Sequence, residues 1–293
     1  MAKTGSSGEE RAVLVTGCSS GIGAATARRL VAKGFTVFAS ARKKSSLKDL
    51  EAEGGRTLSL DVNDEASMVA AVRAIEGEVG ALHALVNNAG FSQSGAVESV
   101  PMEKVRAQFE TNVFGLVRLT QLVLPAMRSR REGRIVNLSS MGGKLVFPGG
   151  GFYHATKYAV EAISDALRFE LRGFGIDVVL IEPGLIKSGF GDAAVASMGP
   201  SAGTSKKSDP YAAFHAAVAK ATKESYEKGP LAKLAGVPDD VAKAIEKALT
   251  TRNPKPRYTV SCSATALLGQ RALLTDRGWD RFLRTNFPTP GEG

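Results

Sequence analysis

Short apolar runs rich in β-branched residues alternate with segments of helical periodicity along most of the 293-residue chain. Such runs are typical of strands that are buried on both faces of a sheet. Their alternation with helices indicates a parallel sheet with right-handed crossovers. We therefore predict an α/β fold, a Rossmann-type doubly wound sheet of about seven strands with helices on both faces. The predicted strands are 12–16, 36–41, 57–60, 84–87, 134–139, 177–182 and 257–261, and the main predicted helices are 21–33, 64–78, 101–130, 152–173 and 239–252.

The regular alternation loosens after residue 189, in a stretch rich in Gly, Ala, Ser and Lys with scattered aromatic residues. Long segments of this kind are either disordered insertions or functional covers over a ligand, and both interpretations stay open. We predict a disordered tail at 1–10 and a single domain over 11–293. That domain includes a substrate lid at about 189–236 and a C-terminal extension at about 262–293.

The net charge of +9 and the pI of about 9.6 raise the question of nucleic acid. The basic residues are scattered and no aromatic-basic module accompanies them, so we expect no nucleic-acid partner. Two distant cysteines, Cys18 and Cys262, indicate no disulfide framework and favour a cytoplasmic location. No apolar run is long enough to span a membrane, and three histidines outside ligand spacing predict no metal site.

A glycine-rich turn, TGCSSGIG at 16–23, follows the first predicted strand and opens a helix. Gly17, Gly21 and Gly23 permit a sharp turn and a close approach of the backbone to a ligand. Amides at the start of the helix would then donate to a diphosphate at the positive end of the helix dipole. The position of this turn, after a strand and before an amphipathic helix, predicts a dinucleotide-binding loop.

The end of the second predicted strand bears on which dinucleotide is bound. Proteins that prefer NAD usually place an acidic residue about 20 positions after the glycines, where it binds the ribose diol. Ala41 stands there in this chain and is followed by Arg42 and Lys43. The missing carboxylate removes repulsion against a 2′-phosphate, and Arg42 can clamp that phosphate with its planar fork. We predict NADP(H) in preference to NAD(H); solvated charge at a strand end is the alternative interpretation.

Seven short motifs follow one another along the chain: TGCSSGIG (16–23), LDV (60–62), NNAG (87–90), TNVFG (111–115), IVNLSSMGG (135–143), YHATK (153–157) and PGLIKS (183–188). In order and spacing they resemble the short-chain dehydrogenase/reductase family over nearly all of residues 11–262. The resemblance implies the fold, a nicotinamide cofactor and a catalytic set carried by Asn112, Ser140, Tyr153 and Lys157.

Tyr153 and Lys157 stand four residues apart on a predicted helix and therefore share a face. Free tyrosine titrates near pH 10, too high for efficient proton transfer at neutral pH. An ammonium about 4 Å away at an effective dielectric of about 20 contributes roughly 4 kcal/mol, enough to lower the phenol pKa by about three. Lys157 should thus make Tyr153 a working acid and base. His154 points off that face and is interpreted as a bystander.

A serine hydroxyl near the phenol can donate to the reacting oxygen while Tyr153 delivers the proton. Ser140 stands thirteen residues before the tyrosine, as in the family, and Ser139 is the alternative. The resemblance implies further that Lys157 holds the nicotinamide ribose and that Asn112 holds a proton-relaying water. Taken singly, these residues could be a helix-surface pair, a polar residue inside a helix, and turn hydroxyls.

The resemblance also implies which residues contact the cofactor besides the glycines and the basic pair. Ser188 stands where the family usually has threonine, and its hydroxyl can serve the same purpose. The implied contacts are Ser19, Ser20 and Ile22 in the turn, Asp61 and Val62 at the adenine end, Asn88, Ala89 and Gly90 under the ribose, Tyr153 and Lys157, and Pro183, Gly184, Ile186 and Ser188 at the nicotinamide end.

The side chains expected around the reacting oxygen are mostly apolar, with Lys144 the one charge among them. Such a cleft suits a neutral, hydrophobic alcohol or carbonyl compound such as a steroid or retinoid, and the resemblance is to the hydroxysteroid- and retinol-dehydrogenase-like branch. Expected substrate contacts are Ser140, Met141, Phe147, Tyr153 and Phe190, with further lining by Phe91, Leu145, Val146, Phe152 and Met198.

The expected activity is the interconversion of an alcohol and its ketone or aldehyde with NADP(H). A non-catalytic NADP-binding regulator is one alternative, and the intact catalytic set argues against it. A nucleotide-sugar epimerase or dehydratase is another, and the TGxxxGIG spacing and short C-terminal part argue against that. Helices 101–130 and 152–173 commonly pair between subunits in this family, so a homodimer or homotetramer is expected.

Overall fold

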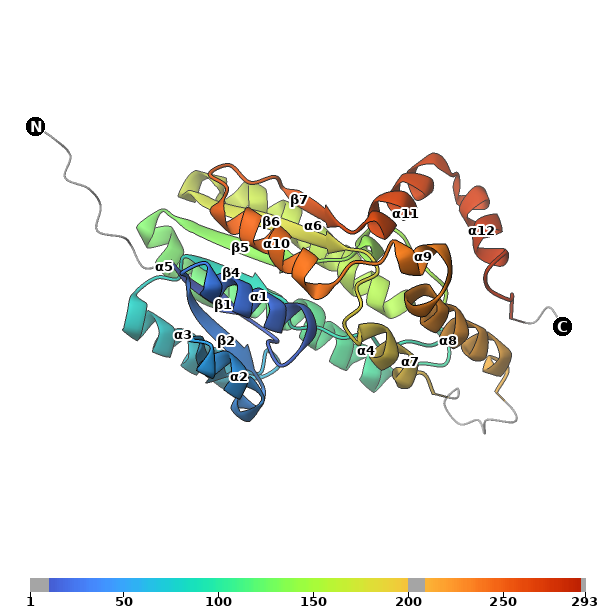
Figure 1. The fold of residues 1–293 in the computed structure, drawn as a ribbon, viewed down its shortest axis with the longest axis horizontal. Coiled ribbons are helices and arrows are strands. Elements are labelled where there is room, and N and C mark those ends of the chain that lie inside the picture. The colour runs from blue at the N-terminus through green and yellow to red at the C-terminus, as the bar shows by residue number, and fades with distance from the viewer. Residues whose placement is uncertain (1–10, 200–208, 291–293) are drawn as a thin grey trace, which may run out of the picture.

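The computed structural model describes residues 11–199 and 209–290, and the predicted tail at 1–10 lies outside them. The described strands form one seven-stranded sheet in the order β3-β2-β1-β4-β5-β6-β7, with every neighbouring pair parallel (Figure 1). This confirms the predicted doubly wound α/β fold of Rossmann type. The strands are β1 (Ala12–Val15), β2 (Thr36–Ala41), β3 (Arg56–Ser59), β4 (Ala84–Asn87), β5 (Gly133–Leu138), β6 (Ile176–Pro183) and β7 (Arg257–Val260).

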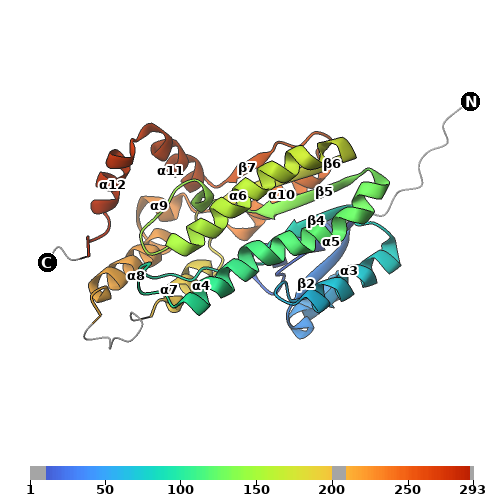
Figure 2. The same cartoon turned by 180° about the vertical axis from the view of Figure 1, so that it is seen from behind.

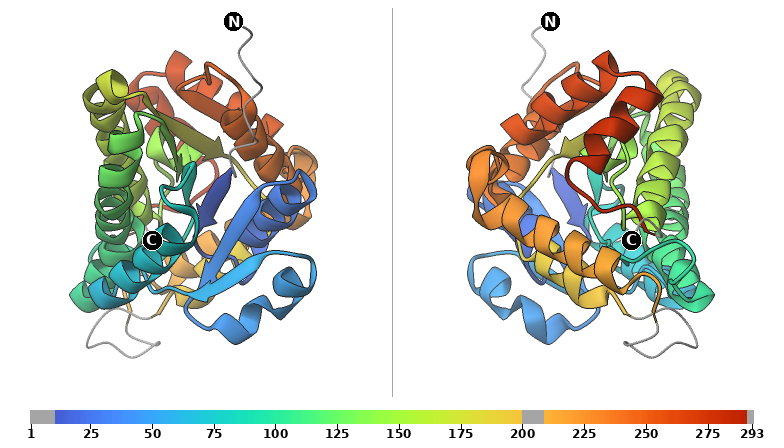
Figure 3. Two further views of the ribbon diagram at one scale, coloured as in Figure 1. Left: turned by 90° about the vertical axis from the view of Figure 1, so that its left-hand side faces the viewer. Right: turned by 90° about the vertical axis from the view of Figure 1, so that its right-hand side faces the viewer.

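Helices cover both faces of the sheet, which lies between them as a middle layer (Figure 3). One face carries α1 (Gly21–Ala32), α2 (Lys48–Ala52) and α10 (Pro238–Thr250), seen in front in Figure 1. The opposite face carries α3 (Glu65–Val79), α5 (Gly115–Arg130) and α6 (Gly151–Leu171), seen in front in Figure 2. Turns of 3-10 helix lie at Lys44–Leu47, Met141–Gly143 and Arg172–Phe174.

The hydrophobic core has two parts because successive strand residues point to opposite faces. Val86 on β4 packs in the same cluster as Leu30 of α1 and Ile245 of α10. Its neighbour Leu85 packs in the cluster on the other face, with Leu119 of α5. Burial on both faces explains why the strands read as nearly continuous apolar runs in the sequence.

The predicted helix over 101–130 is not one regular helix. It consists of α4 (Met102–Phe109), a π-helical turn (Glu110–Phe114) and α5, and in the turn the Gly115 amide donates to the carbonyl of Glu110. A single wider turn hardly changes the spacing of apolar residues, so the periodicity could not reveal it. Turns of this kind occur often at functional sites.

The segment at 189–236 carries helices in its described part, and residues 200–208 lie outside the description. These helices gather with the C-terminal pair of helices beyond the ends of the strands (Figure 1). No helix among the described residues is long and apolar enough to cross a membrane. The helices are α7 (Phe190–Ser197), α8 (Ala212–Glu227) and α9 (Gly229–Lys233), followed after β7 by α11 (Cys262–Leu273) and α12 (Asp276–Arg284).

A buried chain of polar side chains ties the sheet to two helices. The Asn87 amide of β4 donates to the side-chain oxygen of Asn137 on β5 at 2.9 Å and to the hydroxyl of Thr120 on α5 at 3.0 Å. Asn137 donates in turn to the Ser164 hydroxyl of α6 at 2.9 Å. All four side chains are buried, where an unmade hydrogen bond costs about 1–3 kcal/mol. The chain therefore fixes α5 and α6 against the two central strands.

Arg134 on β5 completes the C-terminus of α10. Its guanidinium donates to the carbonyl oxygens of Ala248, Leu249 and Thr251 at 2.6, 2.8 and 3.1 Å, and it pairs with Asp177 of β6 at 2.7 Å. The last carbonyls of a helix have no partner within the helix itself. A cation from the sheet therefore supplies the helix stop that a glycine often provides.

We expect Leu85→Ala to lower the free energy of unfolding by about 2–5 kcal/mol, because the substitution leaves a cavity in the central strand. Leu85 has no exposed surface. The matched control is Leu273→Ala, since Leu273 is 88% exposed, and it should change that free energy by less than about 0.5 kcal/mol. Equilibrium urea unfolding measures both values, and equal effects would contradict the assignment of the core.

Candidate active site

The glycine-rich turn lies between β1 and the start of α1. Gly17 and Gly21 have φ values of +72° and +57°, in the left-handed region that favours glycine. A Cβ on Gly23 would overlap the Gly17 carbonyl oxygen and lie 2.6 Å from the Asn88 amide nitrogen. The helix start therefore packs directly on the turn and on the loop after β4, which no larger residue would allow.

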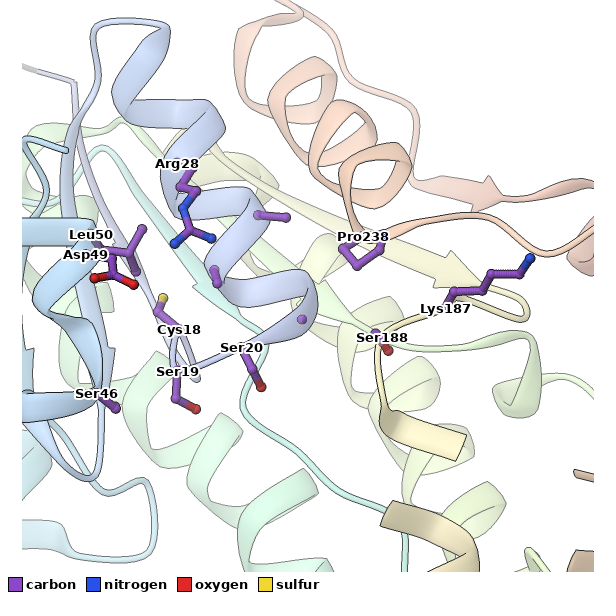
Figure 4. A pocket seen from close by; sticks show the side chains of 13 residues that line it. Cys18, Ser19, Ser20, Arg28, Ser46, Asp49, Leu50, Lys187, Ser188 and Pro238 are labelled. Atoms are coloured by element: carbon purple, nitrogen blue, oxygen red, sulfur yellow. The ribbon is translucent and has the colours of Figure 1, made fainter. Parts of the chain in front are cut away.

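The first turn of α1 leaves backbone donors free for an anion. Ser20 precedes the helix without capping it through its hydroxyl, and the first turn holds no acidic residue. A cavity of about 420 Å³ opens beside this helix start, and the predicted residues Ser19, Ser20, Gly21 and Ser188 line it (Figure 4). Unpaired amides at the positive end of a helix favour a phosphate. The residues present thus fit a dinucleotide.

Four polar side chains in the cavity lining were not predicted, namely Arg28, Ser46, Asp49 and Lys187. Arg28 lies within α1, where its guanidinium pairs with Glu53 at 2.9 Å. Lys187 directly follows the predicted contact Ile186, so its position in the sequence is a signal that could have predicted it. Arg28 and Ser46 carry no such signal, because only the fold brings α2 and its preceding turn beside α1. Arg42 and Lys43 are exposed after β2 and do not line this cavity.

Hydrogen bonds from Thr16 hold the loop after β4 against the glycine-rich turn. The Thr16 hydroxyl accepts from the backbone amides of Asn88 at 2.9 Å and Ala89 at 3.0 Å. The Asn88 side chain donates to the carbonyl oxygens of Thr16 at 2.8 Å and Gly17 at 3.2 Å. A Cβ on Gly90 would lie 3.1 Å from the Asn112 side-chain oxygen. The predicted ribose wall is thus a rigid continuation of the turn.

The remaining predicted cofactor residues leave the carboxyl ends of other strands. Asp61 and Val62 follow β3, and residues 183–188 begin at the end of β6. This last segment is held at one end by β6 and near its other end by a parallel bridge between Ile186 and Gly236. Because the strands are parallel, all these ends meet at one edge of the sheet, where open α/β sheets bind ligands.

Ser140, Tyr153 and Lys157 come together at this same edge. The Ser140 hydroxyl accepts from the Gly142 amide at 3.0 Å and shares a hydrogen bond with the Tyr153 phenol. The Lys157 ammonium donates to the Leu138 carbonyl oxygen at 2.7 Å and lies 5.8 Å from the centre of the Tyr153 ring. The structure therefore unites three of the four predicted catalytic side chains around one point.

Burial governs the titration of the tyrosine and the lysine. It raises the pKa of Tyr153 above its ordinary range, while the Ser140 hydrogen bond opposes this and nearby Tyr226 adds to it. Burial lowers the pKa of Lys157 to about 8, against the attraction of Glu161. The prediction that Lys157 lowers the phenol pKa by about three is wrong for this structure. The loss of hydration outweighs the attraction of an ammonium that is directed at a carbonyl oxygen.

The π-helical turn places Asn112, the fourth predicted residue, behind the loop that follows β4. Its amide donates to the Phe91 carbonyl oxygen at 2.9 Å and to the Thr156 hydroxyl at 3.1 Å, and its oxygen accepts from the Phe91 amide at 3.0 Å. Thr156 lies on α6 between the tyrosine and the lysine. Asn112 therefore fastens the loop to the helix that carries both residues.

Aromatic side chains surround the phenol. The ring of Phe190 on α7 lies 5.4 Å from that of Tyr153, centre to centre, so α7 covers the tyrosine. Met141 and Phe147 belong to an apolar cluster with Trp279 of α12, and the rings of Phe147 and Trp279 are 5.9 Å apart. Two of the predicted substrate contacts, Met141 and Phe147, thus share one apolar cluster, and a third, Phe190, packs on the phenol itself.

Two residues of the predicted lining lie elsewhere. Leu145 has no exposed surface and packs inside the cluster around Trp279, so its place in the lining is wrong. The segment that carries it is covered by α12, an arrangement that no local pattern predicts. Met198 packs against Phe214 of α8 in a separate apolar cluster.

Tyr226 of α8 enters the site without any motif to mark it. Its ring packs on Gly191 of α7, where a Cβ would lie 2.5 Å from a ring carbon. It joins the apolar cluster of Met141 and Trp279, and its proximity helps to raise the pKa of Tyr153. Tyr226 lies in the loosely patterned segment 189–236, which explains why the sequence did not reveal it.

His215 of α8 lies in a group of side chains that looks like a hydrolase triad. Its Nε2 atom is 3.2 Å from the Ser99 hydroxyl, and its Nδ1 atom is 3.4 Å from an Asp209 carboxylate oxygen. Nε2 already accepts from the Ala96 amide at 3.0 Å, and Ser99 donates to the Ala96 carbonyl oxygen. These bonds occupy the atoms that a triad would use for catalysis. The group instead fastens α8 to the loop after β4.

We expect Gly23→Ala to weaken NADPH binding at least about tenfold, a loss of about 1.4 kcal/mol, because the new methyl must displace the dinucleotide loop. The matched control is Gly77→Ala in α3, where a Cβ meets nothing within 4 Å. Alanine is also the better helix former, so this control should keep full affinity. Fluorescence titration with NADPH measures both dissociation constants, and an unchanged value for Gly23→Ala would contradict the packing described.

A family model described as short chain dehydrogenase matches residues 11–198. The chain is 36% identical over 276 residues to the uncharacterized oxidoreductase YbbO of Escherichia coli (strain K12), with 94% of each chain covered. It is 38% identical over 281 residues to the NADPH-dependent 3-dehydrocapnine reductase of Ornithobacterium rhinotracheale, with 92% of this chain and 95% of the relative covered.

The fold agrees with a crystal structure of a short-chain dehydrogenase from Streptomyces avermitilis. The TM-score is 0.75 at 34% identity, and the match covers 95% of this chain and 99% of the other. Together with the dinucleotide loop and the residues gathered at the sheet edge, these matches establish the family. The chain belongs to the short-chain dehydrogenase/reductase family and is an oxidoreductase with a nicotinamide dinucleotide-binding fold.

Proposed function

We propose that the protein is an NADP(H)-dependent enzyme that interconverts an alcohol and its ketone or aldehyde on a mostly apolar small molecule. The observation that carries the proposal is the convergence of Ser140, Tyr153 and Lys157 beside the dinucleotide loop. A bound nicotinamide supplies or accepts the hydride, which is chemistry that no side chain of the site provides.

The side chains of the site handle the proton and the charge on the substrate oxygen. Tyr153 keeps its proton at neutral pH because burial raises its pKa, so it can deliver that proton to the oxygen of a carbonyl compound being reduced. Ser140 donates a hydrogen bond to the same oxygen. Lys157 is mostly protonated below its lowered pKa of about 8, and its charge favours loss of the phenol proton.

The surroundings of the phenol favour an apolar substrate. Met141, Phe147, Phe190 and Tyr226 present aromatic or apolar surface, and few polar groups converge with them. A site of this composition suits a hydrophobic carbonyl compound, of which steroids and retinoids are examples. The relative from Ornithobacterium rhinotracheale is named as an NADPH-dependent reductase, which supports both the cofactor and the reductive direction.

The end of β2 supports a preference for NADP(H). The Cys18 amide donates to the Ser40 carbonyl oxygen at 2.8 Å, which sets Ala41 beside the dinucleotide loop. No carboxylate occupies that position. Arg42 follows directly, and in the part of the chain that the structure describes its guanidinium makes no ion pair. It is therefore free to clamp a 2′-phosphate.

We also propose that the chain forms a homodimer or homotetramer through α5 and α6. Phe114, Tyr158 and Phe169 expose 54%, 43% and 84% of their surface at or beside these helices. Large apolar side chains that are exposed along these helices favour association between copies.

We expect Tyr153→Phe to lower the rate of NADPH oxidation by a factor of about 10² or more, the usual range for loss of an acid and base. NADPH affinity should stay nearly the same, because the phenyl ring keeps its packing. The measurement is NADPH absorbance with a panel of hydrophobic ketones, steroids and retinoids. Tyr158→Phe, on the exposed side of the same helix, is the control and should retain the wild-type rate. A wild-type rate in the Tyr153→Phe protein would contradict the catalytic role of Tyr153.

The double substitution Ala41→Asp with Arg42→Ala should lower the kcat/KM ratio of NADPH to NADH by about tenfold to a hundredfold. The reason is the loss of a charge-assisted bond of about 1.5–3 kcal/mol, together with new repulsion of the phosphate. Steady-state kinetics with both cofactors measures the ratio. Lys44→Ala is the control, since Lys44 pairs with Glu51, and an unchanged ratio in the double variant would refute the clamp.

A further inference from the structure

His154 follows Tyr153 on α6, and its contacts argue against its interpretation as a bystander. Its imidazole is only 7% exposed and lies inside a segment, 142–150, that folds around it. A Cβ on Gly142 would lie 2.6 Å from Nδ1, and a Cβ on Gly150 would lie 2.9 Å from Nε2. One glycine from each pair in the sequence MGGKLVFPGG at 141–150, Gly142 and Gly150, therefore makes room for this ring.

Both ring nitrogens of His154 bind backbone groups of that segment. The Phe147 amide donates to Nε2 at 3.1 Å, and Nδ1 lies 3.0 Å from the Gly142 carbonyl oxygen. An amide can only donate, so Nε2 must be without a proton. A carbonyl oxygen can only accept, so Nδ1 must carry one. The two contacts together require the neutral Nδ1–H tautomer.

The segment that His154 holds carries the groups that face the substrate. The Gly142 amide donates to the Ser140 hydroxyl at 3.0 Å, and the Phe147 ring lies 6.3 Å from the imidazole. The Tyr153 ring lies 5.8 Å from the imidazole. His154 is thus close both to the phenol and to the segment that supplies the serine and the Phe147 ring.

We propose that His154 is a positioning residue for the reaction, which holds residues 140–147 in register with Tyr153 only while its imidazole is neutral. Protonation would turn Nε2 into a donor that faces the Phe147 amide, so that hydrogen bond would be lost. The segment would then move away from the ring and take Ser140 out of reach of the substrate oxygen. The inference rests on the proposed function, because it assigns a role in that reaction.

The surroundings of the ring keep it neutral at pH 7. Burial lowers the pKa of His154 below its ordinary value of 6.5, and the bond with the Gly142 carbonyl opposes that shift. Lys144 is paired with Glu161 and Glu182 at 3.4 and 3.8 Å. Other titratable groups on the elements packed near the ring include Tyr153 and Lys157 of α6, Tyr226 of α8, and Arg271, which lies over Trp279.

The first test compares pH profiles of kcat/KM for the wild type, His154→Gln and His154→Leu. The wild type should lose activity on the acid side, below about pH 6.5. Glutamine carries a donor and an acceptor but does not titrate, so His154→Gln should lack this acid limb and keep most of the plateau. His154→Leu should lose about tenfold to a hundredfold at every pH, the scale expected for a misplaced group. It should also lack the limb.

An acid limb in His154→Gln that coincides with the wild-type limb would overturn the proposal. A His154→Leu protein with the wild-type plateau and profile would overturn it as well. Each profile is read against its own plateau, so residual activity is enough for the comparison. NADPH titration shows whether each variant is folded. If one variant does not bind NADPH, the pH profile of the other is compared with that of the wild type.

A second test does not depend on turnover. In protein labelled with ¹⁵N-histidine, the His154 resonances should show the Nδ1–H tautomer at pH 8, and His154→Gln identifies them by their loss. An Nε2–H tautomer would overturn the proposal. If the wild type reduces none of the carbonyl panel while the Nδ1–H tautomer is found, the proposed function fails and the geometry of His154 stands.

Discussion

The hydrogen bond between Asn87 and Asn137 connects the two central strands with the helices on one face of the sheet. Each amide in the pair is buried, so every donor without a partner would destabilise the fold by about 1–3 kcal/mol. That cost makes one alignment of α6 along β5 much more favourable than any shifted one. Tyr153 and Lys157 depend on this alignment, since a slip of one helical turn would move both away from Ser140 by about 5.4 Å.

Burial lowers the pKa of Lys157, and a group of buried acids opposes that effect. Behind Lys157 lie Glu161 and Glu182, both buried, with Arg257 within 3.1 and 3.2 Å of them. Burial raises the pKa of Glu182 and its neighbour Glu161 adds to that shift, while Arg257 holds both carboxylates in place. Buried acids paired in this way supply negative potential to the lysine ammonium. The network explains how a lysine this deep can keep its charge at neutral pH.

The strand runs and the glycine-rich turn predicted the fold and the dinucleotide loop, because both depend on short stretches of sequence. Contacts made by distant segments were not predictable in this way. Arg28 and Ser46 reach one cavity only because α2 packs beside α1, and Tyr226 reaches the phenol only through the placement of α8. The contacts of His154 could not be predicted for a related reason: helical spacing places the residue on α6 but does not show the segment 142–150 that folds around it.

The guanidinium of Arg134 has a consequence for the order of folding. The carbonyl oxygens that it caps belong to residues 114 to 117 positions later in the chain. These carbonyl oxygens therefore gain their partner only when β5 is in place, although the hydrogen bonds within α10 are local. Contacts this far apart in sequence form slowly because a long loop must close first. We therefore expect the capping of α10 by Arg134 to be a late step of folding.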